Sequence, residues 1–230
     1  MSSTTKSDPD APTLSERRRN ASRELMRAEI LTAAQHIIRT QGLDALSLRA
    51  LAKAVGVTAP ALYEYFDSKD AILRSLFVQG SEVMLTLMEQ VIADSPPGLP
   101  ALQAVLTGYR AFARDEPDYF RLLFSSVDPA LAITEEEYGG MHSIFERFVG
   151  VIVGCIEAGE LQPLPPFVMS CSLWALTHGV ALLETESFMS RKDLDGDGKV
   201  FHFDSAVRLA LLAFATPQGA LLIEPIEDPL

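Results

Sequence analysis

The feature that most constrains the fold is the stretch from Ser47 to Lys69, which reads SLRALAKAVGVTAPALYEYFDSK. It contains two short segments with apolar residues at helical spacing, and Gly56 separates them. Ser47 and Thr58 stand where the two segments begin, and serine and threonine are residue types that cap helix N-termini. Two short helices joined by a turn of about three or four residues can brace one another at a steep angle. The second helix of such a pair can enter the major groove of DNA, so the stretch predicts a helix-turn-helix.

Helical patterns also flank this pair on both sides. Upstream, apolar residues recur at helical spacing from about Arg23 to a stop at Gly42. Downstream, an apolar stripe runs from about Asp70 to just before Pro96, a length sufficient to link two domains. We therefore expect a three-helix head followed by a long connecting helix.

The charge of the chain is distributed unevenly, and this matters more than the net value of −12. Residues 1–70 hold ten Lys and Arg against nine Asp and Glu, whereas residues 71–230 hold nine against twenty-two. A mildly basic head on an acidic body can bind phosphates locally, while the body is repelled by DNA. The acidic total therefore does not exclude a nucleic-acid partner.

Further residues around the helix-turn-helix follow one pattern without a gap from Ile30 to Leu73. They are Ile30-Leu31-Thr32-Ala33-Ala34, Gly42, Ser47-Leu48-Arg49-Ala50-Leu51-Ala52, Gly56-Val57-Thr58, Leu62-Tyr63-Glu64-Tyr65-Phe66, Ser68-Lys69-Asp70 and Leu73. In these residues the sequence closely resembles the tetracycline-repressor (TetR) family. The resemblance implies a homodimeric DNA-binding transcription regulator, usually a repressor that a small ligand releases from its operator. The rest of the chain resembles the family only in its length and helical plan.

The residues expected to contact DNA are Ser47, Arg49, Thr58, Ala59, Pro60, Ala61, Tyr63, Tyr65 and Lys69. Hydroxyl, phenol, guanidinium and ammonium groups donate hydrogen bonds to phosphate oxygens, and the start of a helix attracts anions. The side chains of residues 59–61 cannot donate, but they can touch thymine methyl groups. We therefore expect backbone and shape readout to dominate over direct base contacts. The alternatives are tyrosines that pack at the domain edge and a lysine that is simply solvated.

The predicted fold is all-α, with an N-terminal three-helix DNA-binding domain linked by a long helix to a C-terminal helical ligand-binding and dimerisation domain. The expected boundaries are a flexible arm at 1–22, the helix-turn-helix domain at 23–70, the effector-binding and dimerisation domain at 71–216 and a tail at 217–230. Within the body we expect helices at about 100–115, 118–126, 135–159, 166–189 and 204–215. The arm ends in Arg17-Arg18-Arg19, which either reaches a minor groove or only solubilises the tail.

The body carries aromatic and soft side chains at helical spacing, as expected of a core or of an apolar ligand pocket. The candidates for a ligand pocket, which the family resemblance implies, are Tyr109, Phe112, Phe120, Phe124, Met141, Phe145, Trp174 and His178. Trp174 and His178 are four residues apart and so share one helix face. For each of these residues, ordinary core packing is the alternative.

The resemblance also implies that the last two long helices form the dimer interface. Apolar residues available there are Leu173, Leu176, Val180, Leu183, Val207, Leu211 and Phe214. Periodicity alone does not distinguish such an interface from the core of one subunit.

One segment lies outside the family pattern. Residues 193–204 begin as Asp-Leu-Asp-Gly-Asp-Gly, like a calcium-binding EF-hand loop, and Asp204 takes the twelfth position. Phe201 at the ninth position and Asp in place of Glu at the twelfth depart from that pattern. The alternatives are a calcium site and an acidic solvated turn.

Taken together, these features predict a sequence-specific transcription regulator whose partners are operator DNA, a second copy of the chain and a small, largely apolar effector. No cofactor is required, and a calcium-responsive interaction protein or a small-molecule enzyme is the alternative. The sequence has no Ser/His/Asp signature, phosphate-binding loop or HExxH motif, so we do not expect an enzyme. A polar N-terminus without an apolar signal core, and no apolar run near the ~18 residues of a bilayer span, favour a cytoplasmic protein with no membrane partner.

Overall fold

The structure is a computed structural model that describes residues 13–124, 131–185 and 203–223. Its contacts divide the chain into two compact units, Met1–Leu76 and Phe77–Leu230. The sequence placed the boundary between head and body a few residues earlier, at 70/71. Within the described ranges, helices supply the regular structure and the only β-pairing is an isolated bridge between Leu161 and Ala215. The predicted all-α class is therefore confirmed.

The N-terminal unit contains the expected helix-turn-helix. Its elements are α1 (Leu14–Gln41), a short 3-10 helix (Leu43–Ala45), α2 (Leu48–Val55), α3 (Ala59–Leu62) and the start of α4 (Lys69–Ala93). The Ser47 hydroxyl accepts from the Ala50 amide at 3.2 Å, and the Thr58 hydroxyl accepts from the Ala61 amide at 3.4 Å. Gly56 ends α2 in the left-handed conformation, with φ of 73°, which glycine adopts without strain. The buried core includes Ile30, Ala34, Leu46, Leu51, Leu62 and Phe66.

The first correction concerns the predicted arm, because α1 begins at Leu14 and residues 14–22 are helical. Thr13 caps the helix by accepting from the Glu16 amide, and the Glu16 carboxylate accepts from the Thr13 amide in return. Every residue from Thr13 to Leu25 is exposed, so this part of the helix has no buried face to impose an apolar period. The sequence signal that was available is the capping box. Residues 1–12 lie outside the described part of the chain.

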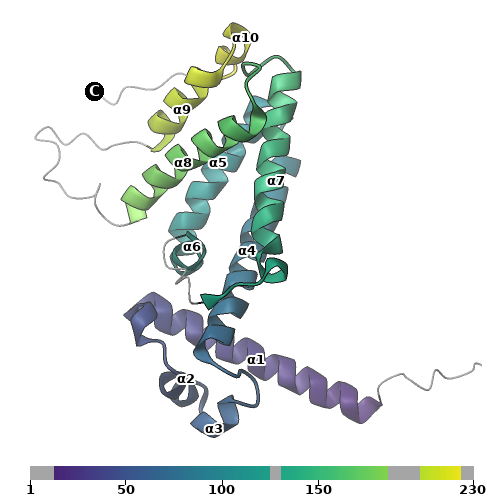
Figure 1. The fold of residues 1–230 in the computed structure, drawn as a ribbon, viewed down its shortest axis with the longest axis vertical. Helices are drawn as coiled ribbons and strands as arrows, with labels where there is room; N and C mark the ends of the chain where they lie inside the picture. The colour runs from purple at the N-terminus through teal and green to yellow at the C-terminus, as the bar shows by residue number, and fades with distance from the viewer. Residues whose placement is uncertain (1–12, 125–130, 186–202, 224–230) are drawn as a thin grey trace, which may run out of the picture. The chain divides into compact units, whose positions relative to one another are not determined.

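The C-terminal unit contains the remainder of α4 and the helices expected in the body (Figure 1). They are α5 (Leu99–Asp115), α6 (Pro117–Phe124), α7 (Glu135–Glu157), α8 (Pro166–Thr185), α9 (Phe203–Phe214) and the short α10 (Pro217–Ala220). Helix α5 packs against α6, α7 and α8, and α8 packs in addition against α9. The centre of the unit is buried and apolar, with Leu99, Leu102, Phe112 and Phe120 among its fully covered side chains.

The second correction concerns the predicted tail, because residues 217–223 belong to the C-terminal unit. Thr216 caps α10, and its amide donates to the Glu160 carbonyl at 2.9 Å. Gly219 and Ile223 are buried. Pro217 begins α10 and does not end the structure, because proline is favourable in the first turn of a helix, where its missing N–H would be unbonded anyway.

The third correction concerns the dimer interface. Leu173, Val180, Val207 and Leu211 are buried inside their own unit, and Phe214 is half-buried. Only Leu176 and Leu183 of the predicted set are largely open, each 40% exposed. The apolar side chains that α8 and α9 leave uncovered also include Phe167, Val168 and Leu209.

The fourth correction concerns apolar length. By length and composition alone, three helices are suitable for crossing a membrane, namely Lys69–Ala93, Glu135–Glu157 and Pro166–Glu184. Uninterrupted apolar runs in these helices stay short, so candidate spans were not expected, whereas the average hydropathy of a long window tolerates one or two charged residues.

Candidate DNA-binding surface and effector pocket

Helix α3 presents a capped, open face to solvent. Thr58, Pro60 and Tyr63 are exposed, with 53% of Tyr63 accessible, whereas Leu62 is completely buried. Ala59 and Ala61 are half-buried. Leu62 therefore packs the helix against the core, while the capping hydroxyl of Thr58 and the phenol of Tyr63 lie on the exposed side, where they can contact phosphates.

Two arginines of α1 hold the end of α3, and the sequence analysis did not single them out. Arg23 Nη2 donates to the Glu64 carbonyl at 3.0 Å, and Arg27 Nη1 donates to the Tyr65 carbonyl. The Arg27 guanidinium also lies 4.1 Å from the centre of the Phe66 ring. The two arginines thus satisfy the carbonyl groups of Glu64 and Tyr65, which follow a short helix and have no partner within it. The four-residue spacing of the two arginines was the available signal.

The remaining predicted DNA contacts lie around this helix with different degrees of exposure. Ser47 and Arg49 are exposed at the start of α2. Tyr65 and Lys69 are half-buried, and Lys69 Nζ lies 3.5 Å from the Leu43 carbonyl oxygen. Tyr63 is thus the more accessible of the two tyrosines, and contact of any of these residues with DNA stays a prediction.

In the C-terminal unit, five of the eight predicted ligand residues come together. Tyr109 of α5 forms a 2.7 Å hydrogen bond with Nδ1 of His178 on α8. Phe120 and Phe124 of α6 and Trp174 of α8 complete the group, and ring centroids in contact are 5.3–6.3 Å apart. We call Tyr109, Phe120, Phe124, Trp174 and His178 the aromatic cluster.

The polar groups of the aromatic cluster are uncharged near neutral pH. Burial raises the pKa of Tyr109 far above that of an ordinary phenol, and a hydrogen bond from Trp174 opposes this only in part. Burial likewise lowers the pKa of His178. The cluster thus offers a neutral hydrogen-bonding pair inside an apolar surround, a combination suited to orienting a largely apolar ligand.

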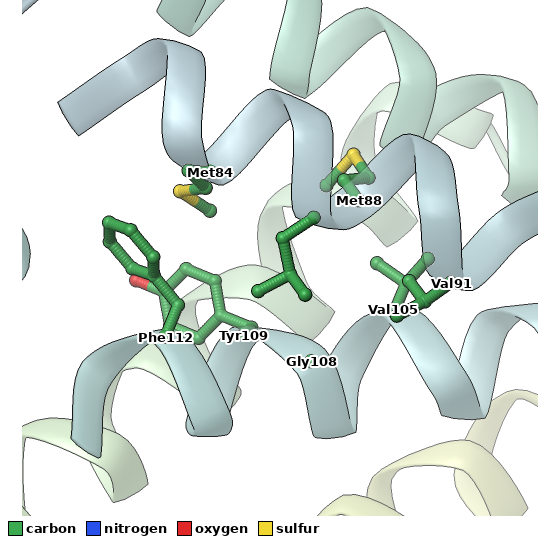
Figure 2. A pocket seen from close by; sticks show the side chains of 8 residues that line it. Met84, Met88, Val91, Val105, Gly108, Tyr109 and Phe112 are labelled. Carbon is green, nitrogen blue, oxygen red and sulfur yellow. The ribbon is translucent and has the colours of Figure 1, made fainter. Parts of the chain in front are cut away.

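Tyr109 also lines a small cavity between α4 and α5 (Figure 2). The lining residues are Met84, Leu87, Met88, Val91, Val105, Gly108, Tyr109 and Phe112. The cavity volume is about 10 Å³, roughly the least space that admits one water molecule. Phe112, predicted as a ligand residue, faces this cavity and not the aromatic cluster. The contribution of α4 was missed because apolar spacing does not reveal which helix an apolar side chain will meet.

The other two predicted ligand residues lie on α7. The Phe145 ring contacts Phe167 at 5.6 Å between centroids, and Met141 is half-buried. The ring contact of Phe145 is therefore with Phe167, which is not a member of the aromatic cluster.

An ion pair that the sequence analysis did not single out ties α5 to α8 and α9. Arg110 Nε and Nη2 donate to the two carboxylate oxygens of Glu184 at 2.9 and 2.8 Å. Arg110 Nη1 lies 3.5 Å from Asp204, and the guanidinium lies 4.9 Å from the centre of the Phe203 ring. A bidentate arginine–carboxylate pair fixes direction as well as distance, so this pair orients the ends of α5 and α8.

The possible calcium loop, residues 193–204, lies almost wholly outside the described residues. Only its last two residues, Phe203 and Asp204, are described. Asp204 stands in the first turn of α9 with its carboxylate near Arg110. In the described part of the chain, no group of three or more His, Cys, Asp or Glu is placed to hold a metal ion. Calcium binding stays a prediction.

A capped helix-turn-helix in one unit and a helical body with an aromatic cluster in the other define a one-component DNA-binding regulator. Family comparison agrees with this class. The profile described as "Bacterial regulatory proteins, tetR family" matches residues 30–76, and that described as "Tetracyclin repressor-like, C-terminal domain" matches residues 102–203. The chain belongs to the TetR family of transcription regulators, as the sequence predicted.

Individual relatives are distant. The chain is 25% identical over 191 residues to an uncharacterised HTH-type transcriptional regulator of Mycobacterium tuberculosis, covering 81% of each protein. It is 26% identical over 153 residues to the regulator RutR of Escherichia coli K12, covering 66% of this chain and 72% of RutR. A solved structure from Rhodococcus sp. RHA1 superposes with a TM-score of 0.69 at 19% identity, covering 83% of this chain and 95% of that one. At that identity, the structural likeness establishes the fold alone.

Proposed function

We propose that this protein is a dimeric repressor that binds operator DNA through α3 and leaves it when an apolar ligand enters the C-terminal unit. The observation that carries the DNA-binding part is the open face of α3, on which Thr58, Pro60 and Tyr63 are exposed above the buried Leu62. A short helix held on one side only, with hydroxyl groups on the other, is suited to lie across a DNA groove. Arg49 and Ser47 supply further phosphate contacts from the start of α2.

The test starts with selection of bound duplexes from genomic fragments by the purified protein. Replacing Tyr63 with Phe removes one exposed phenol O–H, and we expect the affinity for the selected duplex to fall several-fold. Tyr138→Phe is the matched control, since it removes an exposed phenol from the C-terminal unit. Equal affinity of the Tyr63→Phe and Tyr138→Phe variants would refute the assignment of Tyr63, and failure of the wild type to select DNA would refute the proposed function.

The effector site that we propose comprises the aromatic cluster and the adjoining cavity. The cavity volume of about 10 Å³ is too small for an organic ligand, so binding must displace side chains of the cluster. The ligand chemistry that fits is a flat, largely apolar molecule with one group that hydrogen-bonds to Tyr109 or His178. Trp174 is the single tryptophan of the chain and is 39% exposed, so its fluorescence reports binding directly. A panel of neutral aromatic compounds is expected to change this fluorescence and to release DNA at the same concentrations. Release of DNA without any change in Trp174 fluorescence would place the effector elsewhere.

The dimer interface that we propose uses the uncovered apolar face of α8 and α9, including Val168, Leu176, Leu183 and Leu209. A glutamate at Leu209 would bring two charges into such an interface, and we expect light scattering to show monomers. Leu221→Glu is the matched control at a leucine that is 86% exposed directly after α10. A dimeric Leu209→Glu variant would exclude α9 from the interface.

From the proposed operator binding we infer that the protein works in the cytoplasm without a membrane partner, and that it regulates and does not catalyse. Calcium at residues 193–204 is an independent question that isothermal titration of the purified protein with CaCl₂ answers. Heat of binding that disappears in an Asp195→Asn, Asp197→Asn variant would establish the site, and no heat with the wild type would remove it.

A further inference from the structure

The N-terminal extension of α1, residues 14–22, is a basic helical surface that continues from the turns of α1 whose arginines bind the end of α3. Between Thr13 and Arg27 the chain has five arginines against two glutamates. The extension is a regular continuation of α1, started by the capping box of Thr13 and Glu16. Figure 1 shows the N-terminal end of α1 extending away from α2 and α3, beyond the rest of the N-terminal unit. The arginines are therefore held in fixed directions by a helix and not scattered along a loose arm.

The direction of one arginine follows from the bonds made by its neighbours on the helix. Arg19, Arg23 and Arg27 follow one another at intervals of four residues, which puts them on one stripe with about 6 Å between successive side chains. Arg23 and Arg27 point to the end of α3, because they donate to the carbonyls of Glu64 and Tyr65. Arg19 is exposed and lies one turn further along the same stripe. Arg19 therefore extends the stripe one turn beyond the arginines that bind the end of α3.

We propose that Arg19 binds a phosphate of the DNA backbone next to the site occupied by α3, so that the helical extension of α1 is a second backbone clamp. This inference rests on the proposed DNA binding and adds a contact site to it. Two observations commit the surface to DNA: its excess of positive charge, which complements phosphate, and its place on the same helix stripe as Arg23 and Arg27, which bind the end of α3. The contact is to backbone and carries no base preference.

The neighbouring arginine supplies a matched control. Arg18 lies on the same exposed turn, but five residues before Arg23, and so points about 140° away from it around the helix axis. Arg18→Ala and Arg19→Ala change the net charge equally and differ in direction only. A general electrostatic attraction would make the two variants alike, whereas a positioned contact would separate them.

The experiment measures fluorescence anisotropy of wild-type and variant proteins with a duplex that the wild type has selected, over a series of KCl concentrations. For Arg19→Ala we expect at least a fivefold loss of affinity, and a slope of log affinity against log salt that is shallower by about 1 per head, or about 2 per dimer. The same loss factor is expected on a scrambled duplex of equal length, because phosphates are common to both. Arg18→Ala is expected to change the slope by less than half as much.

A second variant tests the role of the helix without removing charge. Ala21 is exposed between Arg19 and Arg23, and Ala21→Pro interrupts the helix there. We expect Ala21→Pro to lose most of the affinity that Arg19→Ala loses, with the thermal stability of the head retained because the extension is exposed.

The possible results distinguish failure of the clamp from failure of the proposed function. A wild type that binds no duplex overturns the proposed function. A wild type that binds, together with equal salt slopes for Arg18→Ala and Arg19→Ala, overturns the clamp alone. Undiminished affinity of Ala21→Pro also overturns the clamp, because Arg19 would then need no helix to place it.

Discussion

Replacing Gly219 with alanine tests whether α10 is an integral part of the C-terminal unit. A Cβ at Gly219 would lie 2.8 Å from the carbonyl carbon and 3.1 Å from the Cα of Glu160, and closer still to the carbonyl oxygen. All three are backbone atoms, so a change of side-chain rotamer does not relieve the clash. Helix α10 must therefore move away from the turn that follows α7.

The cost can be assembled from the bonds that this movement breaks. The Thr216 amide donates to the Glu160 carbonyl at 2.9 Å, and the Thr216 hydroxyl donates to the Gly159 carbonyl at 2.7 Å. Two hydrogen bonds contribute about 1 kcal/mol each, and overpacking costs about 1–3 kcal/mol when the structure relaxes. We expect the free energy of unfolding to fall by about 2–4 kcal/mol. The two costs do not add in full, because breaking the hydrogen bonds lets α10 move and relieves part of the overpacking. At about 2–4 °C per kcal/mol for a chain of this size, the melting temperature falls by about 5–15 °C.

The assay is thermal unfolding followed by far-UV circular dichroism, with Gly150→Ala as the control. Gly150 is exposed in the interior of α7, and nothing lies within 4 Å of a Cβ built there. Alanine at that position is expected to raise the free energy of unfolding by up to about 1 kcal/mol, since glycine is a poor helix former. The reasoning fails if Gly219→Ala melts at or above the temperature of the wild type.

Three further predictions concern the two sites. Arg27→Met removes the hydrogen bond to the Tyr65 carbonyl. We expect the free energy of unfolding of the head to fall by about 1–2 kcal/mol and its affinity for DNA to fall as well. An unchanged midpoint of urea unfolding would contradict this. Burial lowers the pKa of His178, so protonation favours the unfolded chain. The stability present above the ordinary histidine pKa of 6.5 is lost as the pH falls below it. The midpoints of urea unfolding at about pH 7 and about pH 5 should therefore differ less in His178→Gln than in the wild type. Gly108→Ala places a methyl 3.6–3.7 Å from Val91, an ordinary contact, and should raise the melting temperature by about 2–4 °C; a lower value would mean that the α4–α5 cavity is not free space.

The helix-turn-helix was predictable because its determinants are local. Ser47 and Thr58 cap the helices that follow them, and Gly56 adopts the left-handed conformation that ends α2. Each of these roles depends on a few neighbouring residues, so the sequence window contains the whole cause. The helices of the body were located for the same reason, through their apolar spacing and the prolines between them.

The ends of the fold were mispredicted because apolar spacing is informative only where a helix has one buried face. The start of α1 is exposed on all sides, and α10 is one turn long, too short for a period to show. In both places the capping residue, Thr13 or Thr216, was the usable signal. Capping residues deserve more weight than periodicity at the ends of a chain.

The partners of apolar and charged side chains were beyond the reach of the sequence for a different reason. Leu173 and Leu176 are both apolar residues of α8, yet one is buried in its own unit and the other is open. They lie about 60° apart around the helix axis, so one apolar stripe includes both. Such a stripe can lie wholly in the core, lie wholly in an interface, or place one residue in each. The pairing of Arg110 with Glu184 joins residues 74 positions apart, and no local pattern announces it.

Tyr109 joins the proposed effector site to α4. Its hydroxyl bonds to His178, and its ring lines the cavity whose other wall includes Met84 and Met88 of α4. Helix α4 is continuous from Lys69 to Ala93, across the division between the two units at 76/77. We therefore expect a ligand that moves Tyr109 away from His178 to repack α5 against α4, and the continuous helix α4 to pass the displacement along its length. Because a ligand shifts a two-state equilibrium only by its difference in affinity for the two states, a compound small enough to enter without moving Tyr109 would bind and leave DNA affinity unchanged.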